Sequence, residues 1–498
     1  MKIELTKTSQ SGSVLVAFAV NSKRGKVERL NLTHPGLERR LNSAIEGREL
    51  SSKAQESVSF RDIDFDGFRH VVVVGLGETL DHEAFRQAAA VVHGHLKAFK
   101  AENSTISMDG VLNDKRKAPK LVQGFVEGLL LSDYNFDELK SKKKETTEKK
   151  MDPVVKIVTK LATDAATKKA FHEAVILAES VNFSRRLGDM PGNLMTPTIL
   201  ADTVVDAVKG TGIKATIWDK ARIKKEKMGG LYGVSQGSDQ EPRFIILEYK
   251  GAAASKKPVV FVGKGLTFDC GGISIKPSAA MEEMKYDMCG GANVIGATLA
   301  IAKLKLKVNV ICLVPSTENL VNGSATKPGD VHYARNGKSF EINNTDAEGR
   351  LILADALCYA TEQKPQVIID AATLTGAIVV ALGNTHTGYF TRTVAMKKKI
   401  EAAADVSGEW VWNMPLTDHH VKDMKGTFAD LSNMSSSKGA GSATAAAFLE
   451  QFVGEDIPWA HFDIAGTAWA VGNRLPYCPK RGASGAMIRT FVELAKQY

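Results

Sequence analysis

Two nearby segments of the sequence carry charged side chains of the types that bind metal ions. The segment VGKGLTFDCGGISIKP places Lys264, Asp269 and Lys276 in a Gly-rich loop directly after an apolar run. A second segment, EEMKYDMCGG, contains Asp287. Carboxylate oxygens are common ligands of divalent cations, and a charged lysine nearby can stabilise negative charge that develops during a reaction. These residues therefore indicate metal-assisted chemistry.

A third segment, NNTDAEGRLILADAL, adds Asp346, Glu348 and Arg350 at the start of a predicted helix. Asp346 and Glu348 are two residues apart, so on an extended segment their side chains point the same way. Four carboxylates that converge raise one another's pKa values unless a cation is present. Two divalent ions about 3.5–4 Å apart, as in two-metal hydrolases, would neutralise such a cluster.

Each of these residues also has an ordinary structural explanation. A single Asp in a Gly-rich loop is usually a turn residue. Asp346 could stand near a helix start because a negative charge is favourable there. Taken singly, the residues favour these explanations, whereas their ordered combination favours a functional site.

The segments that would position this site alternate between strands and helices. The apolar runs FIILEYK, PVVFVG, VNVICLVP and PQVIIDAAT are predicted strands, and residues 291–304 and 350–361 are predicted helices. Such alternation predicts an α/β fold with a mainly parallel central sheet flanked by helices. Ligands bind beyond the carboxyl ends of the strands in such sheets, where the charged segments fall.

The first part of the chain predicts a separate, small α/β domain. SVLVAFAV and HVVVVGLG are strand candidates, and residues 83–97 form a helix candidate. The charged stretch DELKSKKKETTEKKMD, residues 137–152, has the composition of an exposed connection. A further helix is predicted over residues 163–187. We therefore expect an N-terminal domain over residues 1–160 and a larger C-terminal domain over residues 161–498.

Composition limits the class of protein. Hydrophobic residues make up 44% and charged residues 24% of the 498 positions, which is typical of a folded protein and not of a disordered one. The apolar runs are too short to span a membrane, and SVLVAFAV suits a first strand better than a signal peptide. The five cysteines form no CxxC pair, which favours reduced thiols and a cytoplasmic location. The net charge of +9 leaves nucleic acid binding open, although no recognisable reading motif is present.

Together, the charged segments resemble a known family. NTDAEGRL, with KGLTFDCGGISIKP and MKYDM before it, is similar to the leucine aminopeptidase family of cytosolic dinuclear metallo-exopeptidases. The resemblance covers residues 160–498, including DAATLTGA and HFDIAGTAW, and is loose over the first 150 residues. It implies a metal-dependent aminopeptidase that hydrolyses the amino-terminal peptide bond and prefers leucine-like residues. The nucleophile would be a hydroxide that bridges two metal ions.

The resemblance also implies a role for each charged residue. One ion, Mn or Zn, would be held by Lys264, Asp269, Asp287 and Glu348, and the other by Asp269, Asp346 and Glu348. Lys276 and Arg350 match the two catalytic residues of the family that bind no metal, and the counterpart of Arg350 holds a bicarbonate ion. Residues that match the substrate pocket of the family are Met284, Thr373, Leu374, Gly376 and Ala465. The sequence departs from many members at Cys270, where they have Ser, and we expect altered tuning of the site without loss of activity.

Further expectations concern partners. The family forms homohexamers, acts in the cytoplasm and requires a free amino terminus on its peptide substrates. Some bacterial members also bind DNA, so a DNA-binding regulator that is also a peptidase is the alternative hypothesis. No membrane association is expected.

Overall fold

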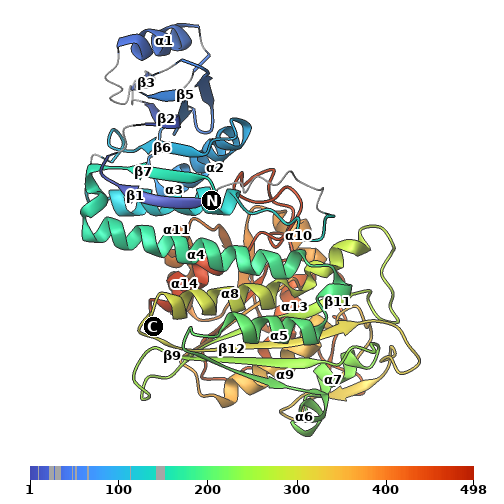
Figure 1. Cartoon of the computed structure of the whole chain (residues 1–498). Helices are drawn as coiled ribbons and strands as arrows, with labels where there is room; N and C mark the ends of the chain where they lie inside the picture. Colours follow the sequence, from blue (N-terminus) through green and yellow to red (C-terminus); the bar gives the residue numbers. More distant parts are fainter. Residues whose placement is uncertain are drawn as a thin grey trace. The chain divides into compact units, whose positions relative to one another are not determined.

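The structure is a computed structural model of the whole chain, and it forms two compact units (Figure 1). It describes residues 1–498 except 9–10, 22–26, 29–34, 48, 51–52, 64, 66, 113 and 142–151. The units are Met1–Glu179 with Gly472–Pro479, and Ser180–Val471 with Lys480–Tyr498. They divide within helix α4 (Ala165–Asp189), which contains the predicted helix 163–187 almost entirely. The domain boundary predicted at residue 160 stays a prediction, and most of the charged connection lies outside the described residues.

The N-terminal unit is built on a largely parallel sheet. Its strand order is β1 (Lys2–Thr6), β7 (Val154–Val158), β6 (Asn103–Ser107), β2 (Gly12–Asn21), β5 (Phe68–Gly75) and β4 (Ser57–Phe60), and β3 (Val27–Glu28) pairs with β2. The predicted strands SVLVAFAV and HVVVVGLG coincide with β2 and β5. The valines of β2, and Val72 and Val74 of β5, are buried in a hydrophobic core that includes helices α2 (His82–Ala98) and α3 (Ala118–Ser132), whereas Val71 and Val73 belong to a second core. Helix α1 (Pro35–Glu46) completes the helices described before α4.

A segment from near the end of the chain, Gly472–Pro479, belongs to this N-terminal unit. Its Tyr477 is 2% exposed, and the hydroxyl donates a hydrogen bond to Glu83 Oε1 at 3.0 Å. The Tyr477 ring also lies 5.7 Å from the guanidinium of Arg86, which is itself paired with Glu127. Residues almost four hundred positions apart therefore share one buried cluster.

The larger unit contains a second sheet whose centre is parallel. Its order is β17 (Val411–Asn413), β16 (Thr387–Phe390), β19 (Trp459–Asp463), β15 (Val367–Ala372), β10 (Val259–Gly263), β12 (Asn309–Asn319), β9 (Arg243–Lys250) and β8 (Ile213–Trp218), with β11 (Gly265–Asp269) paired to the end of β12. The pairs from β19 to β12 are parallel, and so is the edge pair β16–β17, whereas β9 with β12, β8 with β9 and β16 with β19 pair antiparallel. The predicted α/β class with a mainly parallel central sheet is confirmed, with antiparallel pairing toward its edges.

Helices cover both faces of this sheet because successive side chains of the buried strands point to opposite faces. Val260 and Val262 of β10 face a core that includes α9 (Gly349–Glu362), whereas Phe261 lies 5.7 Å from Phe491 of α14 (Ile488–Ala495), measured between ring centroids. Helix α8 (Cys289–Lys303) packs against α14. The predicted helices 291–304 and 350–361 correspond to α8 and α9 (Figure 1).

The structure assigns further elements to this unit. They are η2 (Gly192–Leu194), α5 (Pro197–Ala207), α6 (Lys220–Lys225), α7 (Gly229–Ser235), the 3-10 helix η3 (Met281–Met288), α10 (Gly376–Leu382), α11 (Val394–Ser407), α12 (Asp418–Lys422), α13 (Gly441–Glu450) and a small sheet of β13 (Val331–Tyr333), β14 (Ser339–Glu341) and β18 (Leu431–Ser432). Another 3-10 helix, η1 (Lys160–Thr163), precedes α4. Among the described residues, no helix combines the length and the apolar character needed to cross a membrane.

Candidate metal centre

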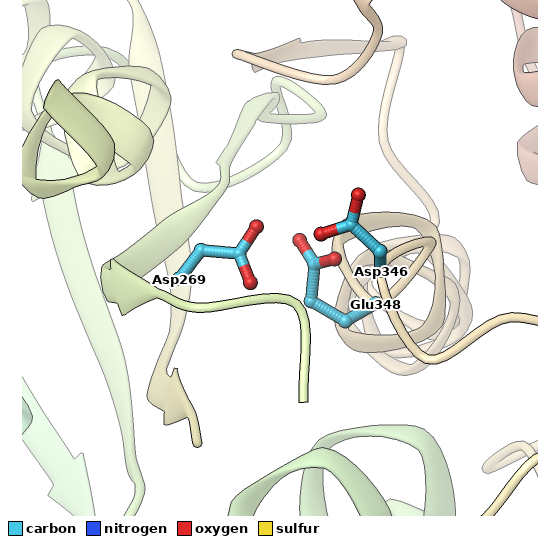
Figure 2. A group of neighbouring side chains, drawn as sticks. All are labelled: Asp269, Asp346 and Glu348. Carbon is cyan, nitrogen blue, oxygen red and sulfur yellow. The ribbon is translucent and has the colours of Figure 1, made fainter. Parts of the chain in front are cut away.

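Three carboxylates converge at the carboxyl edge of the central sheet. Asp269 is the last residue of β11, and Asp346 and Glu348 lie directly before α9 (Figure 2). One oxygen from each of them lies within 4.8 Å of the other two. Asp269 and Glu348 are almost completely buried, whereas the Asp346 side chain is 32% exposed. This spacing is suited to a cation held between the carboxylates.

The loop after β11 is held against the segment before α9 by Asn319, the last residue of β12. Its Nδ2 atom donates to Asp269 Oδ1 at 2.8 Å and to the Thr345 carbonyl oxygen at 3.1 Å. The backbone N–H of Gly271 also donates to Asp269 Oδ1, at 2.9 Å. Gly271 has φ of +90°, and a Cβ atom there would lie 2.8 Å from Asp346 Oδ1. Glycine at this position therefore allows Asp269 and Asp346 to approach each other.

Lys264 brings a fourth carboxylate into the cluster. This lysine directly follows β10, and its Nζ atom lies 2.7 Å from Asp287 Oδ2 and 2.8 Å from Glu348 Oε1. Its third partner is the Thr373 carbonyl oxygen, at 3.1 Å. The hydroxyl of Thr373 in turn donates to Asp287 Oδ1 at 2.6 Å, which fixes the carboxylate of this η3 residue.

Lys276 lies on the other side of the cluster. Its Nζ atom is 2.9 Å from Asp269 Oδ2 and 2.5 Å from Asp346 Oδ1. Both lysines thus place an ammonium group between two carboxylates. The structure brings together the charged residues that the sequence proposes as metal ligands, and Lys276, which it proposes as a catalytic residue, lies beside two of them.

Burial and charge shift the pKa values of these groups. Burial, and after it the charge of Asp269, raises the pKa of Glu348 to about 8. Burial likewise raises the pKa of Asp287 and of Asp346. It acts to lower the pKa of the Lys264 amine, but the surrounding carboxylates, Asp287 foremost, raise that pKa above its usual value. Such shifts are typical of functional sites and of buried ion-pair networks alike.

The carboxylate of Glu348 shows that the lysines leave this cluster incompletely satisfied. Its Oε2 atom is buried and has no hydrogen-bond partner among the described residues. An unsatisfied buried acceptor costs about 1–3 kcal/mol, and more when it is charged. A divalent cation between Asp269, Asp346 and Glu348 would satisfy Glu348 Oε2, because carboxylate oxygens are ligands that such ions bind. The residues present therefore fit a bound metal.

Arg350, the second residue of α9, lies beside the carboxylates without an ion pair to them among the described contacts. One guanidinium nitrogen, Nη1, donates to the Asn433 carbonyl oxygen at 2.8 Å, and the side chain is buried. Burial lowers the pKa of Arg350 to about 10, although the charge of Glu348 acts to raise it. The group is still a cation at neutral pH, so it can bind an anion.

The residues proposed to line the substrate pocket lie on two loops and two helical segments. Thr373 and Leu374 follow β15, and Ala465 follows β19. The hydrogen bonds described above tie Thr373 to Asp287, and Asp463 accepts from the backbone N–H groups of both Leu374 and Ala465. Gly376 begins α10 and Met284 lies in η3, and no described hydrogen bond joins these two to the others.

Sequence reasoning missed two residues that organise the site, Asn319 and Asp463. Both are the last residues of strands that end at the carboxyl edge of the sheet. A polar residue at the end of an apolar strand was the available signal, because such residues face the ligand-binding edge. Cys270, the departure from many family members, is buried, and burial raises the pKa of its thiol.

Family models match both parts of the chain. The model described as "Cytosol aminopeptidase family, catalytic domain" matches residues 182–492, and the one described as "Cytosol aminopeptidase family, N-terminal domain" matches residues 15–143. A probable cytosol aminopeptidase of Bdellovibrio bacteriovorus is 68% identical over 487 residues, which cover 97% of this chain and 96% of the relative. A probable cytosol aminopeptidase of Burkholderia mallei is 40% identical over 461 residues, 92% of this chain and 90% of that protein.

Solved structures agree with these matches. A mutant of tomato leucine aminopeptidase superposes with a TM-score of 0.87 at 30% identity, covering 100% of this chain and 97% of that chain. The bottromycin maturation enzyme BotP in complex with Mn superposes with a TM-score of 0.84 at 30% identity, covering 97% and 99%. With both family domains matched and a relative 68% identical over nearly its whole length, the chain belongs to the cytosol aminopeptidase family and is a peptidase hydrolase, as its sequence predicts.

Proposed function

We propose that the protein uses two divalent metal ions to hydrolyse the amino-terminal peptide bond of peptides. The observation that carries this proposal is the convergence of Asp269, Asp346 and Glu348, with an unsatisfied buried oxygen on Glu348. Mn and Zn are the proposed metals, and the Mn complex of BotP, a structure similar to this chain, supports the first.

The proposed ligand sets are those that the family resemblance implies, and the convergence of Asp269, Asp346 and Glu348 supports them. Lys264, Asp269, Asp287 and Glu348 would hold one ion, and Asp269, Asp346 and Glu348 the other. When bound, the ions supply Lewis acidity and lower the pKa of a water molecule so that it becomes a nucleophile near neutral pH. As a ligand, Lys264 must lose its proton, because only a neutral amine offers a lone pair.

Lys276 and Arg350 are the proposed catalytic residues. The Lys276 ammonium lies against Asp269 and Asp346, at the edge of the cluster where it is 21% exposed. From there it can stabilise the negative charge that develops on the oxygen of the scissile carbonyl. The buried Arg350, at the start of α9, would hold an anion such as bicarbonate that accepts and returns protons, and the helix start favours an anion there.

The proposed substrates are peptides with a free amino terminus. A neutral amino group is a metal ligand, so binding to one of the ions would place the first peptide bond at the reactive centre. The pocket proposed for the first side chain is formed by Met284, Thr373, Leu374, Gly376 and Ala465. Its apolar members support a preference for leucine-like residues.

Two changes test this proposal with one assay. Dialysis against a chelator should abolish cleavage of leucine amide, and adding back Mn or Zn should restore it. Acetylating the amino group of the substrate should block cleavage by the metal-loaded protein. Undiminished cleavage of the acetylated substrate contradicts an exopeptidase that binds a free amino terminus.

We also propose a cytoplasmic homo-oligomer, a hexamer by family resemblance. The location rests on the cysteine pattern and on the name shared by the relatives. Sedimentation at micromolar concentration tests the assembly, and a mass equal to the 53.7 kDa monomer contradicts it. We do not propose DNA binding, because the net charge of +9 is weak support by itself.

A further inference from the structure

A buried carboxylate, Asp463, accepts hydrogen bonds from two residues of the proposed substrate pocket. It is the last residue of β19 and is 1% exposed. Its Oδ1 atom accepts hydrogen bonds from the backbone N–H groups of Leu374, at 3.1 Å, and Ala465, at 3.3 Å. Its Oδ2 atom accepts from the Thr375 hydroxyl at 2.6 Å. One carboxylate thus joins the loop after β15 to the loop after β19.

Further hydrogen bonds at Thr373 and Thr375 also hold the loop after β15. Thr373 donates its hydroxyl to Asp287 Oδ1 and offers its carbonyl oxygen to Lys264. Thr375, two residues later, accepts at its hydroxyl from the backbone N–H of Ile378, at 3.2 Å, and so caps α10. Leu374 therefore lies between an attachment to the metal centre and an attachment to Asp463.

Burying a carboxylate is unfavourable unless several donors compensate it. Two loops can be connected without burying a carboxylate, so a structural connection alone does not explain why Asp463 is present. What its donors share is that they belong to the two loops that carry Leu374 and Ala465. Charge-assisted hydrogen bonds are short and directional, which suits them to fixing the positions of these loops.

We propose that Asp463 is a positioning residue that sets the selectivity of the pocket for the first substrate side chain by fixing Leu374 and Ala465. This inference rests on the proposed function, because it assigns these two residues to the substrate pocket. Asp463 itself touches no substrate in this account. Its effect is on the width and shape of the pocket, and hence on binding of the substrate side chain.

The chain offers a matched control for this idea. Glu409 is another buried carboxylate, which accepts from the Met487 N–H at 2.8 Å, the Thr490 N–H at 2.9 Å and the Thr490 hydroxyl at 2.7 Å. Glu409 lies between α11 and β17, its carboxylate contacts the start of α14, and it accepts no hydrogen bond from the pocket loops among the described residues. Thr490→Val therefore deletes a hydroxyl–carboxylate hydrogen bond like the one that Thr375→Val deletes, together with the 2.8 Å hydrogen bond between the Thr490 and Ser407 hydroxyls.

The experiment compares Thr375→Val and Asp463→Asn with two controls, Thr375→Ser and Thr490→Val. For each, kcat and KM are measured with leucine, phenylalanine and alanine amides after Mn is restored. For Thr375→Val we expect KM for the preferred amide to rise about tenfold while kcat changes by less than about threefold, with a flattened order of preference. Asp463→Asn should change in the same direction, and both controls should stay within about twofold of the wild type.

A second readout does not depend on activity. Hydrogen–deuterium exchange of the metal-free protein should be faster in Thr375→Val for peptides covering residues 372–378 and 463–467, and unchanged there in Thr490→Val. An unaltered order of preference together with unaltered exchange in Thr375→Val overturns the proposal. An equal change of preference and exchange in Thr375→Val and Thr490→Val overturns it as well. If the wild type cleaves none of the amides, the proposed function fails, and the exchange comparison still decides whether Asp463 positions the loops.

Discussion

The ammonium nitrogen of Lys264 lies 2.8 Å from the buried carboxylate of Glu348. Protons and metal ions compete for this pair. The pKa of Glu348 is raised to about 8 by burial first and by Asp269 next, and neighbouring carboxylates raise the pKa of Lys264. At neutral pH both groups thus carry protons that a bound cation would have to displace.

Metal affinity should therefore increase with pH. If both protons are displaced, affinity rises by up to about 100-fold per pH unit below pH 8 and by about tenfold per unit above it. Competition with a coloured chelator at pH 6.5, 7.5 and 8.5 measures this dependence. Calorimetric titration in buffers of different ionisation enthalpy counts the protons released, and an affinity that does not vary with pH contradicts the prediction.

Substitutions should separate metal ligands from catalytic residues. Asp269→Ala and Glu348→Ala should lose both metal and activity, since each side chain is a proposed ligand of both ions. Lys276→Ala should keep two metals per chain but lose about 10²–10³ in kcat, because an ammonium group aimed at the oxyanion is removed.

Arg350→Ala should also keep its metals and lose less rate, because free bicarbonate or water can carry protons in its place. Elemental analysis alongside kcat decides the outcome. A Lys276→Ala protein without metal, next to a Glu348→Ala protein with both ions, would reverse the proposed roles.

A single added methyl group should disturb the site without changing any charge. A Cβ atom at Gly349 would lie 2.6 Å from Lys264 Cε and 2.7 Å from Lys264 Nζ, so Gly349→Ala displaces the amine from its partners. We expect metal affinity to fall about tenfold, in line with the 1–3 kcal/mol typical of an overpacked buried position. Gly94→Ala is the control, since a Cβ atom there meets nothing within 4 Å. Equal metal affinity in both variants contradicts the expectation.

Stability should depend on pH through Asp355, a fully buried residue of α9. It accepts from the backbone N–H groups of Leu231, at 2.9 Å, and Arg335, at 2.8 Å, yet burial raises its pKa to about 7. In the unfolded chain this pKa is about 3.9. The contribution of protonated Asp355 is thus fully present below about pH 4 and is lost as pH rises through about 7.

Between pH 5 and 8 this loss amounts to about 2–3 kcal/mol in the free energy of unfolding. Asp355→Asn does not titrate, so its Tm should be lower than that of the wild type at pH 5 but should change less with pH. Thermal unfolding followed by circular dichroism at pH 5, 6, 7 and 8 measures both curves. Parallel curves would show that Asp355 has the same pKa in the folded and unfolded chain.

Local sequence patterns predicted the elements that are buried on both sides. PVVFVG and VNVICLVP are continuous apolar runs, so their assignment to β10 and β12 needed no knowledge of distant partners. The charged segments could be placed at one edge of the sheet because each of them follows a predicted strand or precedes a predicted helix. Asp463 and Asn319 were overlooked because their partners, Leu374 and Thr345, are far along the chain. The spacing of hydrophobic residues predicts local helices and strands, but it does not indicate which distant residues form hydrogen bonds with each other.

The burial of Tyr477 beside Glu83 also constrains when the N-terminal unit can be completed. These residues are 394 positions apart, so a ribosome that adds roughly 5–20 residues per second delivers the tyrosine about 20–80 s after the glutamate. During that interval the Arg86 side chain lacks the aromatic ring that covers it in the finished protein. Nascent chains held before residue 472 would thus expose a buried ion cluster, and the first unit to be made is completed by a segment that follows most of the second unit in the sequence.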